Sequence, residues 1–140
     1  MFNIKRYEDL IKSLVNAGLK PTTNWNEKLS SNSLLIRHDV DFSIEYAHQL
    51  ALFESQLKIC STFFFLLSSN LYNSMSAHNQ KLIKEIADME HKVSIHFDHT
   101  VYENLEYFKH EKNIFENIFG KKVDIVSIHR PRDFLNNNNA

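Results

Sequence analysis

The sequence predicts an α/β fold in which parallel strands alternate with helices. Segments with apolar residues at helical spacing alternate along the chain with short apolar runs of strand length, as expected for parallel β/α units. Four of these apolar runs are followed at once by polar residues that could carry chemistry. Because the carboxyl ends of parallel strands share one face, these polar residues are expected to meet at one rim of the sheet.

The first part of the chain predicts a helix, a loop and one β/α unit. Apolar residues at helical spacing indicate a helix over residues 4–17. Residues 20–33 are polar, with many Ser and Asn, and predict a loop. The apolar run over 34–39 predicts the first strand. Ser43 is expected to cap the next helix, which should run to about Leu57.

The remaining elements repeat this alternation. A continuous apolar run over 60–67 predicts a strand that is buried on both faces. Periodic and continuous apolar segments then predict a helix over 77–90, a strand over 93–97, a helix over 103–119 and a strand over 123–128. The Asn run at 136–140 predicts a disordered tail, so residues 1–135 are expected to form a single domain.

Length and composition indicate one soluble globular domain. The chain has 140 residues, of which 43% are hydrophobic and 24% charged. The formal net charge of -1 gives no reason to expect nucleic acid or an anionic membrane as a partner. The single cysteine, Cys60, excludes an intrachain disulfide framework. We expect a cytoplasmic protein without a membrane span, because no apolar run resembles a signal peptide or is long enough to cross a bilayer.

The most informative segment joins the first strand to two carboxylates. Side chains alternate along a strand, so Asp39 and Asp41 are expected to point to the same side. Two acids at one strand end repel each other and need a cation, a shared proton or a strong donor. The pair therefore indicates a metal site or an acid/base site. The alternative is that the pair caps the following helix, whose N-terminus favours negative charge.

Histidine and arginine side chains follow the last two predicted strands. His96 and His99 come after the third strand, and imidazoles near a carboxylate suit a divalent ion of the zinc type. The alternative is a solvated loop, since the chain has 8 histidines. His129 and Arg130 come after the fourth strand. A guanidinium at that position could orient a carboxylate or bind an anionic group, and the alternative is an ordinary basic turn.

Four segments, taken in their order, resemble the polysaccharide deacetylase family, or NodB-homology domain. They are Arg-His-Asp-Val-Asp at 37–41, Ser-Thr-Phe-Phe-Phe at 61–65, His-Lys-Val-Ser-Ile-His-Phe-Asp at 91–98 and Ser-Ile-His-Arg-Pro at 127–131. The chain looks closest to the branch associated with surface-polysaccharide gene clusters. The resemblance covers roughly residues 34–132. It implies a distorted (β/α) barrel that holds a divalent metal, usually zinc, and removes acetyl groups from N- or O-acetylated sugars.

The resemblance also implies roles for individual residues. By position, Asp39 matches the aspartate that acts as catalytic base, and Arg130 matches the arginine that orients it. Asp41 matches the metal-binding aspartate, and His96 matches the first metal-binding histidine. The metal is expected to be Zn²⁺, with Co²⁺ or another transition metal as the alternative.

The third metal ligand differs from the pattern of the family. The family usually spaces its two metal histidines four residues apart, and the residue at that position is Thr100. His99 lies one residue earlier and is the first candidate for the third ligand. His129, after the next strand, is the alternative.

The chain ends soon after the arginine motif, where the family continues with further strands and a late histidine that acts as general acid. Four strands cannot close an eight-stranded barrel. We therefore expect the first half of a deacetylase domain, with the metal residues present, catalytic competence left open, and an exposed sheet edge through which copies could associate.

Two other interpretations stay open at this point. The first is a remnant without catalysis that binds a metal or a glycan. The second is an open, doubly wound sheet of the receiver type with an acidic Mg²⁺ pocket. That fold also places acids after its first strand, but it would not need His96 and His99 on the same rim.

Overall fold

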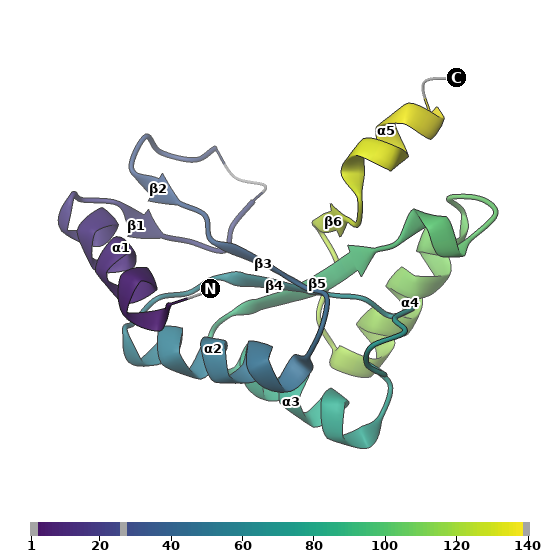
Figure 1. Ribbon diagram of the computed structural model, residues 1–140, viewed down its shortest axis with the longest axis horizontal. Coiled ribbons are helices and arrows are strands. Elements are labelled where there is room, and N and C mark those ends of the chain that lie inside the picture. The colour runs from purple at the N-terminus through teal and green to yellow at the C-terminus, as the bar shows by residue number, and fades with distance from the viewer. Residues whose placement is uncertain (1–2, 26–27, 139–140) are drawn as a thin grey trace.

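The computed structural model describes residues 3–25 and 28–138. It is an α/β fold in which four parallel strands form a curled half-barrel sheet that alternates with helices (Figure 1). In chain order the elements are α1 (Ile4–Asn16), β1 (Lys20–Pro21), β2 (Ser33–Leu34), β3 (Arg37–Val40), α2 (Ile44–Gln56), β4 (Thr62–Phe65), α3 (Ala77–Asp88), β5 (Lys92–Phe97), the 3-10 turn η1 (His99–Val101), α4 (Tyr107–Phe119), β6 (Val126–Ile128) and α5 (Pro131–Asn138). Within the described ranges, no helix is both long and apolar enough to cross a bilayer.

The main sheet has the winding of a barrel. Its strand order is β3-β4-β5-β6, so each strand pairs with the next one along the chain. Helices α2, α3 and α4 lie together on one side of this sheet (Figure 1). A doubly wound sheet would reverse its strand order and place helices on both faces. The predicted parallel β/α units of a partial barrel are therefore confirmed, and the doubly wound alternative is not the observed fold.

The hydrophobic core lies between the sheet and these three helices. Phe63 and Phe65 on β4 are fully buried, and Ile95 occupies the neighbouring position on β5. Ile83 from α3 and Phe115 from α4 belong to the same cluster and are equally buried. Residues at alternate positions of β3, β4 and β5 point to the opposite, inner face, because side chains alternate along a strand.

The sheet curls toward its inner face. Side chains of β3 and β6 meet there although two strands separate them, since Arg37 Nη2 donates a hydrogen bond to Ser127 Oγ at 3.1 Å. The pairing of β3 begins at Arg37, where the Thr62 amide donates to the Ile36 carbonyl. The predicted strand over 34–39 is therefore split, and its first residue belongs to β2.

Three other predicted boundaries were wrong. The loop predicted over 20–33 contains the short parallel pair of β1 and β2. The helix predicted over 103–119 begins only at Tyr107, because turns occupy the residues before it and the Asn104 side chain accepts a hydrogen bond from the Glu106 amide. The last strand begins at Val126, three residues later than predicted.

The C-terminal segment is helical where a disordered tail was predicted. Helix α5 begins at Pro131, whose fixed φ suits the first helical position, and Asp133 lies in the first turn. The helix runs to Asn138 and so includes residues 136–138. Residues 139–140 lie outside the described residues.

Strands β3 and β6 are the two ends of the four-stranded sheet. In the part of the chain that the structure describes, each of them pairs with one neighbour only. Unpaired strand edges can add a strand from another molecule. Self-association through such an edge stays a prediction.

Candidate metal centre

Strand register brings the candidate ligands to one level at the carboxyl end of the sheet. Val40 pairs with Phe65, and Phe65 pairs with Ile95. Asp41 directly follows the end of β3 and His96 is the next residue on β5, so the two lie level with each other on the inner face.

His129 reaches the same face from β6. His96 pairs with Ser127, and His129 follows two residues later, so the alternation of the strand directs it inward. The His129 amide donates to the Phe97 carbonyl at 2.9 Å, which extends the ladder between β5 and β6 by one step. This backbone bond holds His129 against the end of β5.

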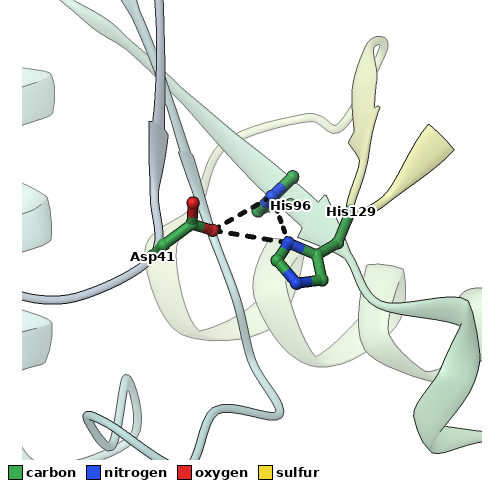
Figure 2. Close-up of side chains that lie close together, drawn as sticks. All are labelled: Asp41, His96 and His129. Atoms are coloured by element: carbon green, nitrogen blue, oxygen red, sulfur yellow. Dashed lines mark hydrogen bonds and ion pairs between the residues drawn. The ribbon is translucent and has the colours of Figure 1, made fainter. Parts of the chain in front are cut away.

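Asp41, His96 and His129 form a compact triad with their ligand atoms facing one another (Figure 2). Asp41 Oδ1 lies 3.3 Å from His96 Nε2 and 3.4 Å from His129 Nδ1. The two imidazole nitrogens are 3.0 Å apart. Zinc bonds of about 2.0–2.2 Å in tetrahedral geometry separate neighbouring ligand atoms by roughly 3.3–3.6 Å. The three separations are close to this spacing, so the triad fits three corners of such a site.

The hydrogen bonding of His96 leaves a lone pair for a cation. Its Nδ1 lies 3.2 Å from the Ser127 carbonyl, which can only accept, so Nδ1 carries the proton. Nε2 is then unprotonated and faces the other two ligand atoms. Metal-binding histidines are commonly oriented in this way by a carbonyl on their second nitrogen. Burial lowers the pKa of His96, although the nearby Asp39 carboxylate opposes this shift, and the lower pKa favours the neutral ring that metal binding requires.

The triad contains two facing acceptors. His96 Nε2 and Asp41 Oδ1 both present lone pairs, and Asp41 Oδ1 is buried without a hydrogen-bond partner in the described part of the chain. His129 can supply one proton at Nδ1, and that proton can serve only one of the two acceptors. A divalent cation would serve all three atoms at once. The residues present therefore fit a metal ion.

Asp39 lies one step below the triad on the same face of β3. Arg37 Nη2 donates to Asp39 Oδ2 at 2.5 Å, and the same nitrogen also contacts Ser127. The other oxygen, Oδ1, is buried without a partner among the described residues. Asp39 therefore has one oxygen held by a guanidinium and one oxygen available for a proton.

Arg37, and not Arg130, is the arginine that contacts Asp39. Arg130 occupies the turn between β6 and α5 with a left-handed φ of 51°, and no contact between it and Asp39 is found in the described residues. Arg37 was not predicted to orient the base. Its position two residues before Asp39 on the same strand could have identified it, because residues i and i+2 share a face.

The geometry favours His129 over His99 as the third ligand. His99 lies in η1, where Asp98 caps the turn by accepting a hydrogen bond from the Thr100 amide. The His99 ring packs against Phe134 of α5, with ring centroids 5.3 Å apart. Its side chain is not among the three that come together at the triad.

A cleft of about 640 Å³ opens beside the triad. Asp41 and His129 contribute to its wall, so a molecule bound there would lie against the candidate metal ligands. Four of the nine other lining residues are apolar, namely Phe42, Leu66, Leu71 and Val101, and five are polar and come from the segments that follow β4, β5 and β6. These polar residues are Ser68, Ser69, Asn70, Asp98 and Arg130. The volume lies within the range of small-molecule sites, which is about 300–1,000 Å³.

Comparison of the chain with protein-family models, with curated proteins and with solved structures found no match. The likeness to polysaccharide deacetylases therefore remains a prediction from the motifs.

Proposed function

We propose that this chain is a metal-dependent hydrolase that removes acetyl groups from an N- or O-acetylated sugar. The observation that carries the proposal is the triad, in which two facing acceptors, Asp41 Oδ1 and His96 Nε2, have one proton at most to share. A cation would bind both acceptors at once, and the cleft beside it, whose wall is partly polar, can hold a substrate.

The donor set favours zinc or a similar transition metal. Two imidazoles and one carboxylate suit Zn²⁺ or Co²⁺, whereas Mg²⁺ prefers oxygen ligands alone. This preference counts against a receiver-type Mg²⁺ pocket. When bound with one position open, such an ion polarises an acyl oxygen and lowers the pKa of water.

Asp39 is the proposed general base. Its buried Oδ1 has no partner in the described residues and could accept the proton of an attacking water. Arg37 holds the other oxygen, so the carboxylate stays in one orientation while it receives the proton.

The cleft suits a sugar in chemical terms. Ser68, Ser69 and Asn70 offer hydroxyl and amide groups that can pair with sugar hydroxyls. Asp98 and Arg130 add one acceptor and one donor of stronger hydrogen bonds. Two parts of the proposal rest on the resemblance of the motifs: that the group removed is an acetyl group, and that the chain acts in surface-polysaccharide biosynthesis.

The test is acetate release by the zinc-loaded chain from an N-acetylated chitooligosaccharide and an O-acetylated xylo-oligosaccharide. Asp39→Asn should keep the metal and lower the rate by about 10²-fold or more, as expected for a lost general base. Asp9→Asn, an exposed aspartate of α1, is the matched control.

The outcomes separate the interpretations. Acetate release that depends on Asp39 supports the proposed hydrolase. A chain that binds zinc and releases no acetate is instead a metal-binding remnant without catalysis. Wild-type rates in Asp39→Asn would exclude this residue as the base.

A further inference from the structure

Three polar side chains form a hydrogen-bonded cluster at the wall of the cleft. Ser68 Oγ lies 2.8 Å from Tyr102 Oη and 3.2 Å from Glu111 Oε1. Tyr102 Oη lies 2.5 Å from the same Glu111 oxygen. Ser68 also lines the cleft that Asp41 and His129 border, so the cluster connects that cleft to the interior of the protein.

Glu111 is a buried acid without a counter-ion. It lies on α4 with 4% of its surface exposed, and its Oε2 has no hydrogen-bond partner in the described part of the chain. No basic side chain forms an ion pair with it among those residues. Burial raises the pKa of Glu111, and the Asp98 carboxylate adds to the rise, while the hydrogen bonds from Tyr102 and Ser68 oppose it.

Tyr102 is held rigidly between Ser68 and Glu111. Its ring stacks on Phe97 at 5.8 Å and on Tyr107 at 5.1 Å between centroids, with interplanar angles of 10° and 9°. A phenol fixed in this way keeps its hydroxyl within hydrogen-bond distance of both neighbours.

The direction of the hydrogen bonds depends on the proton of Glu111. When Glu111 is ionised, Tyr102 and Ser68 both direct their protons inward, and Ser68 presents only lone pairs to the cleft. When Glu111 is protonated, it can donate to Tyr102, Tyr102 can donate to Ser68, and the Ser68 hydroxyl can point its proton into the cleft. In the protonated cluster, the Ser68 hydroxyl can therefore donate a proton to a molecule bound in the cleft.

We propose that Glu111, Tyr102 and Ser68 form a proton relay that supplies the general acid for departure of the sugar amine or alcohol. The inference rests on the proposed hydrolase function. In the step, the C–O bond from water to the acetyl carbon forms and the C–N bond of the amide breaks. The water proton passes to Asp39, and Ser68 protonates the leaving nitrogen while Tyr102 and Glu111 replace its proton in turn. Solvent then returns the proton from Asp39 to Glu111, and the products are an amine and acetic acid.

The test compares two substrates that differ in their need for an acid. The zinc-loaded chain is assayed on an N-acetylated chitooligosaccharide, whose amine must be protonated, and on 4-nitrophenyl acetate, whose nitrophenolate leaves without a proton. Glu111→Gln should lose about 10²-fold or more on the amide and little on the ester. Tyr102→Phe, which interrupts the chain of hydroxyls, should show the same split. Glu103→Gln, an exposed acid before α4, is the matched control.

Two further readouts distinguish a relay from a structural hydrogen bond. Because an acid must be protonated to act, the amide rate of the wild type should fall as the pH rises through the pKa of Glu111, and this limb should vanish in Glu111→Gln. Because burial raises the pKa of Glu111 above 4.5, infrared spectra of the wild type recorded just above pH 4.5 should contain the carbonyl band of a neutral carboxylic acid that Glu111→Gln lacks.

Each remaining outcome overturns a stated part of the account. Absence of that infrared band overturns the relay whatever the activity, since an ionised Glu111 has no proton to give. Equal losses on amide and ester, or no loss, reduce the cluster to packing and also overturn the relay. A folded, zinc-loaded wild type that hydrolyses neither substrate overturns the proposed function, and the relay falls with it.

Discussion

Replacing Asp41 with Asn should stabilise the metal-free chain while it weakens zinc binding. The side-chain amide of Asn can donate a hydrogen bond to His96 Nε2, so the substitution removes the contact between two acceptors. A buried acceptor without a partner costs about 1–3 kcal/mol, and we take roughly 1–2 kcal/mol because the Asp41 side chain is 37% exposed. This gain is the opposite of the destabilisation that most single substitutions cause.

The expected change in melting temperature follows from the chain length. An unfolding entropy of about 2.1 cal/mol/K per residue gives roughly 0.3 kcal/mol/K for 140 residues. A gain of about 1–2 kcal/mol therefore raises the Tm of the metal-free chain by roughly 3–7 °C. Zinc at about 100 times its Kd should stabilise the wild type by about 2.7 kcal/mol, and most of this gain should be absent in the variant.

The assay is thermal unfolding followed by circular dichroism, with chelator-treated protein and again with excess zinc. Asp9→Asn is the control, because its exposed pair with Lys5 contributes at most about 0.5 kcal/mol. A lower Tm for metal-free Asp41→Asn would refute the reasoning, since it would mean that Asp41 stabilises the fold without a cation. An undiminished zinc effect in the variant would remove Asp41 from the ligand set.

Three further predictions test neighbouring parts of the account. In zinc titrations His96→Ala should lose affinity by about 10²-fold or more, whereas His99→Ala should bind zinc normally. The magnitude follows from a four-ligand zinc site worth about 10–16 kcal/mol, or roughly 2.5–4 kcal/mol per ligand. The reverse pattern would restore His99 as the ligand. Arg37→Ala should lower kcat for acetate release more than Arg130→Ala does, since only Arg37 contacts Asp39, and a larger effect at Arg130 would support the original assignment. Burial would raise the pKa of Glu54, but hydrogen bonds from His38, Ser61 and Tyr7 hold this pKa below 4.5. Urea unfolding should therefore show a contribution to stability that is present above pH 4.5 and is lost as the pH falls through the lower pKa of the folded state. A Glu54→Gln variant that loses the same stability on acidification would exclude this residue as the cause.

The alternation of periodicities was sufficient to predict the sheet. In apolar runs such as Phe63–Phe65, side chains on both faces of the strand must be buried, so both faces of the sheet are covered there. The amphipathic helices between these strands then require parallel crossovers. The same logic placed Asp39, Asp41 and His96 at one rim. Periodicity could not predict the residue at which each strand begins. The pairing of β3 at Arg37, for example, depends on the amide of Thr62, which is distant in sequence.

The choice between His99 and His129 depended on geometry that local spacing does not contain. The turn capped by Asp98 directs His99 toward Phe134, whereas the ladder between β5 and β6 carries His129 to the triad. The role predicted for Arg130, contact with Asp39, falls to Arg37 for a similar reason. Arg130 matches a motif, but its left-handed turn leads into α5, while Arg37 shares a strand face with Asp39.

The metal content of the purified chain tests the central claim most directly. Elemental analysis after dialysis against zinc, with His96→Ala measured in parallel, decides whether the triad holds an ion. The account predicts about one zinc ion per wild-type chain and none in the variant. A folded wild-type chain without bound metal, or an equal zinc content in His96→Ala, would contradict it.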